Sequence, residues 1–126
     1  MSIGWIMFTR IQVSRLEKRK NVDVTVDSVY ILQQKGINTH LTIVGDGTQR
    51  DYIKKLVRKR NLEDNVTMTG FISDKQRLLE LYRTSDIFIM PSKGETFGIS
   101  YIEAMTQGLP VVGLKGTGVS GYFSHN

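Results

Sequence analysis

The segment THLTIVGDGTQRDYIKKLVRKR, residues 39–60, decides the fold. Residues 39–44 are short and rich in β-branched side chains, a composition typical of a buried strand. Gly-Asp-Gly at residues 45–47 predicts a turn. Residues 49–60 form a predicted helix with four apolar side chains facing inward: Tyr52, Ile53, Leu56 and Val57. The segment therefore predicts a strand, a tight turn and a helix.

The same alternation extends along the chain. Further strands are predicted over residues 3–13, 65–69, 86–90 and 109–113. Helices are predicted over 21–34, from Ser73 or Asp74 to Arg83, and over 96–107. The helix over 21–34 has an apolar stripe formed by Val22, Val26, Val29 and Tyr30, and Gly36 is its predicted cap. The helix that ends at Arg83 is predicted to bury Leu78, Leu79 and Tyr82.

Strands alternating with helices imply an α/β fold, a Rossmann-like three-layer α/β/α arrangement around a mostly parallel sheet. Ligands of such folds bind beyond the carboxyl ends of the strands. The loops that would surround a ligand are residues 14–20, 45–48, 70–75, 91–98 and 114–121.

Composition narrows the class of protein. The 126 residues suffice for one domain, 1–126, and the formal net charge is +5. Cysteine is absent, which excludes disulfides and thiolate metal sites. The basic excess lies mainly in residues 15–20 and 54–60, which suits a polyanion or a nucleotide diphosphate but equally suits solvated helix faces. The apolar residues 1–8 are too short to cross a bilayer.

Charged residues mark two of the predicted loops. Glu95 precedes the helix predicted over 96–107 and Glu103 lies two turns inside it, so both could face one elongated polar ligand. The structural alternative is that Glu95 caps the helix and Glu103 is solvated. After the first strand, Arg15 and Lys20 could bind phosphate oxygens, or could belong to a basic surface loop.

Other motifs give weak signals or none. Gly45-x-Gly47 lacks the third glycine of a dinucleotide fingerprint, and the letters of Gly116-x-Gly118-x-x-Gly121 have no following helix or acidic partner. His40 and His125 are isolated, so no metal-ligand spacing is present. The sequence has no Asp-x-Asp, Walker loop or nucleophile elbow.

Several segments together carry a family resemblance. Residues 95–105, ETFGISYIEAM, resemble the Glu-x7-Glu motif of family-four glycosyltransferases, the glycosyl transferases group 1 family. The surrounding segments SDIFIMPS (85–92) and GLPVV (108–112) are similar to that family too. Upstream, SRLEKRKNVD (14–23), LTIVGDG (41–47) and NVTMTGF (65–71) match in order and spacing. The resemblance implies the carboxyl-terminal, donor-binding domain of a GT-B enzyme, truncated.

The resemblance implies a retaining, metal-independent enzyme. It would transfer a hexosyl group from a nucleotide-diphosphate sugar to a glycan, lipid or protein acceptor. Arg15 and Lys20 would hold the donor diphosphate, and Glu95 would bind hydroxyls of the transferred sugar. Cations at the leaving phosphate supply the charge stabilisation that the reaction needs. No cofactor or metal is expected, and no protein nucleophile is named.

The resemblance also implies residues for the rest of the donor, a UDP-, GDP- or ADP-sugar. Glu103 would accept hydrogen bonds from the ribose hydroxyls. The backbone around Phe71 and Ile72 would contact the nucleobase, and the amides near Phe97 and Gly98 would also approach the donor.

Departures from the family pattern lie at Ser14, where glycine is usual, and at the ends of the chain. The acceptor-binding amino-terminal domain and the last elements of the donor domain have no counterpart, so the chain alone is expected to be inactive.

Its partners would be the donor and the missing acceptor domain or chain. By analogy with the family, the resemblance implies a role in polysaccharide biosynthesis and a cytoplasmic protein, with peripheral association of the parent enzyme at the inner membrane face. One alternative is a non-catalytic or partner-complementing module of the same fold. Another is an unrelated nucleotide-binding or nucleic-acid-binding domain, which only the charge and the fold favour. The family resemblance itself implies no nucleic-acid partner.

Overall fold

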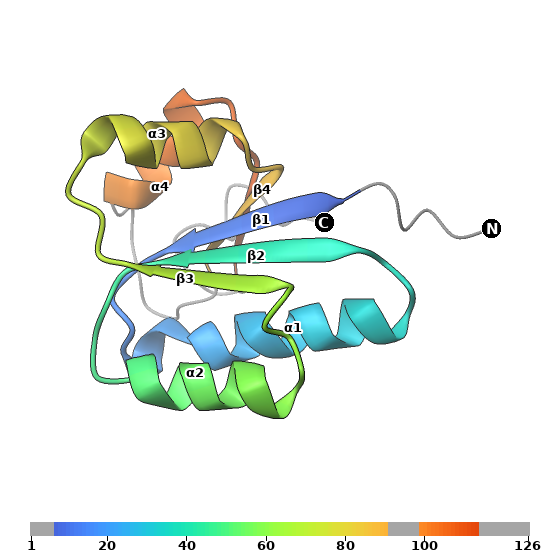
Figure 1. Ribbon diagram of the computed structural model, residues 1–126. Helices are drawn as coiled ribbons and strands as arrows, with labels where there is room; N and C mark the ends of the chain where they lie inside the picture. The colour runs from blue at the N-terminus through green and yellow to red at the C-terminus, as the bar shows by residue number, and fades with distance from the viewer. Residues whose placement is uncertain (1–6, 91–98, 114–126) are drawn as a thin grey trace.

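The structure is a computed structural model that describes residues 7–90 and 99–113 (Figure 1). Strands and helices alternate in the predicted order. The strands are β1 (Phe8–Val13), β2 (Thr39–Val44), β3 (Val66–Gly70), β4 (Ile87–Met90) and β5 (Val111–Gly113). The helices are α1 (Val22–Gln34), α2 (Arg50–Lys59), α3 (Lys75–Arg83) and α4 (Ile99–Thr106), with a short 3-10 helix η1 at Lys18–Lys20.

The strands form one sheet with the order β3-β2-β1-β4-β5, and every pair is parallel. The prediction of a Rossmann-like parallel sheet is therefore confirmed. The chain turns from one side of β1 to the other between β3 and β4, which makes the gap between β1 and β4 the topological switch point. Val13 pairs with Val44, so β1 and β2 end at the same edge.

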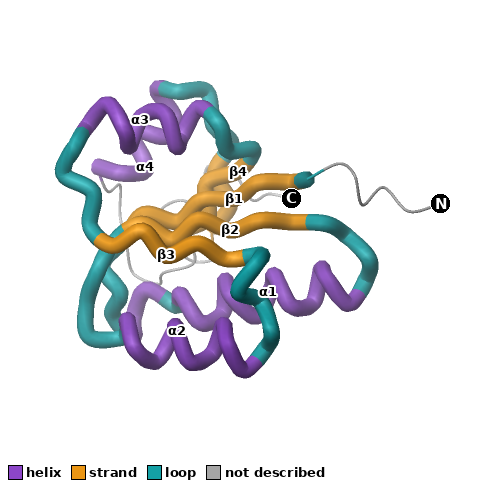
Figure 2. Tube along the Cα trace, viewed as in Figure 1, coloured by secondary structure: helices purple, strands orange, loops and turns teal. Residues whose placement is uncertain are grey.

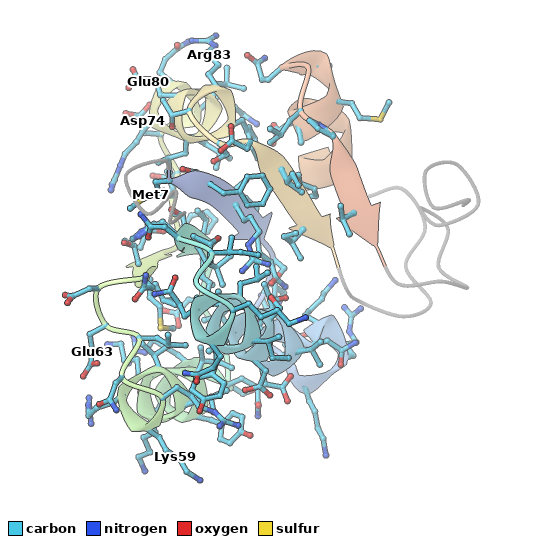
Figure 3. The ribbon with its side chains drawn as sticks, turned by 90° about the vertical axis from the view of Figure 1, so that its right-hand side faces the viewer. Met7, Lys59, Glu63, Asp74, Glu80 and Arg83 are labelled. Carbon is cyan, nitrogen blue, oxygen red and sulfur yellow. The ribbon has the colours of Figure 1, made fainter. Side chains whose placement is uncertain are left out.

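Two helices cover each face of the sheet. In Figure 1, α1 and α2 lie on one side and α3 and α4 on the other. Figure 3 shows the same separation, with Asp74, Glu80 and Arg83 around α3 and Lys59 and Glu63 beside the opposite layer. Each layer closes over its own apolar cluster, one that includes Val26, Leu41 and Ile53 and one that includes Ile11, Tyr82 and Phe88.

Local signals fix two helix ends as predicted. The amide of Gly36 donates to the carbonyl of Gln33 and the amide of Ile37 donates to Leu32, while Gly36 has a φ of 78°. This left-handed cap ends α1 and favours glycine. At the start of α3, the carboxylate of Asp74 accepts from the amides of Gln76 and Arg77, so Asp74 rather than Ser73 is the N-cap.

Some expectations of burial were wrong. Tyr52 is 52% exposed, because Ile53 and Val57, four residues apart, form the buried line of α2 and Tyr52 lies off it. Leu56, Leu79 and Tyr30 are half-buried at the margins of their helices. Residues 1–6, 91–98 and 114–126 lie outside the described residues, so the predictions for the loops at 91–98 and 114–121 and for the first turn of the last helix fall there.

Candidate functional site

Backbone hydrogen bonds join the loops that follow β1 and β2 to each other and to the ends of β2 and β3. The amide of Ser14 donates to the carbonyl of Val44 at 3.0 Å, and the amide of Leu16 donates to the carbonyl of Asp46 at 3.0 Å. The amide of Gly45 donates to the carbonyl of Gly70 at 2.9 Å. Figure 2 shows the loops after β1, β2 and β3 gathered at the edge where the strands end. Bonds between loops continue the sheet past its strands and hold this edge in place.

The turn predicted at residues 45–47 is confirmed, and it is a point of close backbone approach. A Cβ atom on Gly45, whose φ is 139°, would lie 1.8 Å from the backbone oxygen of Ser14. A Cβ atom on Gly47 would lie 2.6 Å from the backbone oxygen of Leu16. Both positions therefore need glycine for the β2–α2 loop to lie against the β1–α1 loop. The close approach of the two loops explains Gly45 and Gly47 without a phosphate-binding loop.

A pocket of about 580 Å³ opens at this edge, on the side of the sheet that α3 covers. Its lining comes from the ends of β1, β2 and β3 and from the start of α3. The lining residues are Val13, Ser14, Arg15, Val44, Gly45, Asp46, Phe71, Ile72, Ser73, Lys75 and Leu78. The position agrees with the rule that ligands of parallel sheets bind beyond the carboxyl ends of the strands.

The pocket combines apolar walls with cationic side chains. Ile72 and Leu78 belong to the apolar core, whereas Phe71 is 77% exposed. A large aromatic ring left open at a pocket is available to stack on a flat apolar ligand. Arg15 and Lys75 provide positive charge in the same lining. The arrangement suits an anionic ligand that also has an apolar, planar part.

Arg15 is held beside the pocket by a neighbour in its own loop. Its Nε donates to Oε2 of Glu17 at 2.6 Å, while 71% of its side chain is exposed. The hydrogen bond from Arg15 is the largest influence that lowers the pKa of Glu17. The charges of Arg15, Arg19 and Lys20 act in the same direction, and desolvation opposes them. Arg15 is thus a charged group that remains accessible to a ligand.

An ion pair connects the pocket to α4. The ammonium of Lys75, the first residue of α3, contacts Oε2 of Glu103. The Glu103 side chain is only 18% exposed, and that of Lys75 is 58% exposed. Lys75 was not predicted as a site residue. A lysine directly after an N-cap in a loop at the carboxyl edge was the available signal, but nothing local indicates a partner 28 residues away.

The structure brings several of the candidate site residues together. Arg15, Phe71 and Ile72 line one pocket, and Glu103 reaches its margin through Lys75. Lys20 ends η1 in the same loop as Arg15, where its carbonyl accepts from Gln12 Nε2 at 3.3 Å, but it is not part of this lining. The remaining candidates, Glu95, Phe97 and Gly98, lie outside the described residues.

The described residues contain neither a metal-binding cluster nor a membrane-spanning helix. Within residues 7–90 and 99–113, no group of three or more His, Cys, Asp or Glu side chains could hold a metal ion. His40 lies on β2, where its Nε2 is 2.8 Å from the hydroxyl of Thr67. Across the same described residues, no helix has the length and apolar character to span a membrane.

Comparisons with known proteins agree with this geometry. The family model for glycosyl transferases group 1 matches residues 8–126. The chain belongs to that family. The alpha-D-kanosaminyltransferase of Streptomyces kanamyceticus is 32% identical over 108 residues, which cover 86% of this chain and 28% of the relative. The amylovoran biosynthesis glycosyltransferase AmsK of Erwinia amylovora is 32% identical over 122 residues, 92% of this chain and 30% of the relative.

A solved structure has the same fold. HepE of Anabaena, in a crystal structure with UDP-glucose, superposes with a TM-score of 0.78 at 28% identity and covers 94% of this chain. The match covers 32% of HepE. This chain therefore spans less than a third of the length of each of these three proteins. The prediction of a GT-B type α/β domain is confirmed.

Proposed function

We propose that this chain is the donor-binding part of a retaining, metal-independent hexosyltransferase that uses a nucleotide-diphosphate sugar. The observation that carries the proposal is one pocket at the carboxyl edge that contains Arg15, Phe71, Ile72 and Lys75, the last of which contacts Glu103. A HepE structure that resembles this chain contains UDP-glucose, which supports the same class of ligand.

Each part of the donor has a chemical partner in this arrangement. The guanidinium of Arg15 would bind the diphosphate, with Lys20 from the same loop as a second cation. The Glu103 carboxylate, which can only accept when ionised, would bind ribose hydroxyls. The exposed ring of Phe71 and the backbone of Phe71 and Ile72 would contact the base. Glu95, with the amides near Phe97 and Gly98, would bind the sugar.

The proposed chemistry depends on charge at the leaving group. As the bond between the anomeric carbon and the phosphate oxygen breaks, negative charge grows on the diphosphate. Arg15 and Lys20 would stabilise that charge, each by about 1.5–3 kcal/mol for a charged hydrogen bond. These cations fill the electrostatic role that a divalent metal plays in other transferases, which supports metal independence. Retention would follow from attack of the acceptor on the same face that the diphosphate leaves.

Nucleotide binding tests the site directly. We expect UDP, GDP or ADP at millimolar concentration to raise the melting temperature of the 126-residue chain, in EDTA as well as without it. Arg15→Ala and Lys20→Ala should remove most of the shift. Lys59→Ala, on the opposite layer of the sheet, is the matched control for loss of a positive charge and should leave the shift intact. Failure of all three nucleotides to stabilise the chain would contradict the proposed site.

Transfer is expected only with an acceptor-binding part present. The donor is normally enclosed when the sugar moves, since an open site admits water. We therefore expect no transfer from the chain alone and transfer from a longer polypeptide that includes the acceptor domain, with the product anomer read by NMR. Nucleotide binding by the chain, combined with no activity in any longer or complemented form, would favour the alternative of a non-catalytic binding module.

A location at the inner face of the cytoplasmic membrane is also proposed for the parent enzyme. The exposed face of α2 carries Lys54, Lys55, Arg58 and Lys59, which suits acidic headgroups. Sedimentation with vesicles tests this idea. Binding to phosphatidylglycerol vesicles but not to phosphatidylcholine vesicles at low salt is expected, and equal behaviour with both would contradict it.

A further inference from the structure

Lys75 has a position that the family resemblance does not explain. It is the first residue of α3, it lines the pocket, and its ammonium contacts Oε2 of Glu103 on α4. The pair is asymmetric, because Glu103 is largely buried while more than half of the Lys75 side chain is exposed. Lys75 is therefore the member that a ligand or salt can reach, and Glu103 is the member that it holds.

The contact has a consequence for what Glu103 can bind. An ionised carboxylate has two oxygens with about four acceptor positions. One ammonium on Oε2 leaves Oε1 and a second position on Oε2 for other donors. A glutamate side chain without such a partner has several rotamers to choose among, and fixing one of them carries an entropic cost. The ion pair with Lys75 fixes the Glu103 rotamer before a ligand binds, so ligand binding does not have to order this side chain.

We propose that Lys75 positions the Glu103 carboxylate for the ribose hydroxyls of the donor, and so makes the site selective for a ribonucleotide. This inference rests on the proposed function, because it assigns the ribose to Glu103. Lys75 is a positioning residue in this role, and its effect on the sugar reaches the ligand through Glu103.

A direct role is the competing explanation. Lys75 and Arg15 belong to the same pocket lining, so the Lys75 ammonium could act on the diphosphate as a simple charge. The two roles differ in which part of the nucleotide they affect. A phosphate contact weakens every uridine diphosphate equally when it is lost. A positioning role affects only nucleotides that have ribose hydroxyls.

Calorimetric titration of the chain with UDP and with 2′,3′-dideoxy-UDP separates these roles. The quantity to compare is the ratio of the two dissociation constants. In the wild-type chain we expect UDP to bind about tenfold or more tightly, the amount expected for hydrogen bonds to a charged acceptor. Lys75→Met should lower this ratio at least about threefold, mainly by weakening UDP. Lys75→Arg should restore the ratio, because the charge and the reach to Glu103 are retained.

Two control variants define the comparison. Lys59→Met removes the same charge from the far layer and should leave the ratio unchanged. Glu103→Gln should itself lower the ratio, and Lys75→Met added to Glu103→Gln should change the ratio no further, since the positioned group is gone. Lys75→Gln repeats the test with a polar side chain if Lys75→Met does not fold with the wild-type circular dichroism spectrum.

The outcomes are distinguishable. Equal weakening of UDP and the dideoxy nucleotide by Lys75→Met, or an unchanged ratio, would overturn the positioning role while leaving the nucleotide site in place. Failure of the wild-type chain to bind either nucleotide would overturn the proposed function, and this inference with it. A reduced ratio that Lys75→Arg restores would support both.

Discussion

Replacing Gly45 by alanine is the most direct test of how the site is built. The new methyl group would lie 1.8 Å from the backbone oxygen of Ser14, and real Cβ atoms essentially never come within 3.0 Å of such an atom. The loops after β1 and β2 would have to separate by at least about 1.2 Å. That movement would strain the hydrogen bond from the Ser14 amide to Val44 and displace Arg15, the next residue.

The magnitude follows from two contributions. A φ of 139° is a conformation that alanine rarely adopts, and a residue held in such a region costs about 1–3 kcal/mol. Weakening one or two loop hydrogen bonds adds about 1 kcal/mol each. We therefore expect Gly45→Ala to lower the free energy of unfolding by about 3 kcal/mol or more. Unfolding free energies of proteins are typically about 5–15 kcal/mol, so the Gly45→Ala variant should still be folded at low temperature.

The matched control is Gly36→Ala. Gly36 also has a positive φ, 78°, but a Cβ atom there would have no neighbour within 4 Å. Only the left-handed conformation is penalised, by about 1–2 kcal/mol. Gly70→Ala, with a φ of 77° and equally open space, repeats the control beside the pocket.

Urea denaturation followed by circular dichroism measures all three variants, and UDP titration measures the site. Gly45→Ala should show the largest loss of stability and the weakest UDP binding. The close approach of the two loops would be refuted if Gly45→Ala cost no more than Gly36→Ala and bound UDP as the wild-type chain does.

Three further predictions concern charges and caps. Asp74→Ala removes the carboxylate that accepts from two amides at the start of α3, and should lower stability by about 1 kcal/mol in urea denaturation, whereas Asp74→Asn should retain most of it. Arg10→Met should leave the urea midpoint unchanged or raise it, because Arg10 is buried, burial lowers its pKa, and Ser28 is its acceptor while no described residue accepts from its Nε or Nη2. A marked loss of stability would show that Arg10 is paired in solution. The pKa of Glu17 is lowered mainly by the hydrogen bond from Arg15, so its stabilising effect should be present above its unfolded-state pKa and should be lost as the pH falls through the lower folded-state value. Urea midpoints of wild type and Glu17→Gln should therefore differ near pH 7 and converge once the pH falls below the folded-state pKa of Glu17, and a constant difference would contradict the assignment.

The sequence by itself determined the order, type and approximate bounds of the elements. The strand at residues 39–44 was predicted with the bounds that the structure has, because β-branched composition and a following Gly-Asp-Gly turn are local signals. Gly36 was recognised as a helix cap for the same reason, and Asp74 as one of two candidates with Ser73, since a cap depends on residues within one turn. Alternation of the elements then implied the parallel sheet.

Only the tertiary structure decided which residues meet at the pocket. Lys75 and Glu103 are separated by 28 residues, and their contact depends on how α3 and α4 lie on one face of the sheet. The close approach of Gly45 to Ser14 requires β1 and β2 to be neighbours, and the exposure of Tyr52 depends on where α2 touches the sheet. Periodicity and capping are properties of neighbouring residues, whereas these contacts join distant ones, so no local pattern in the chain encodes them.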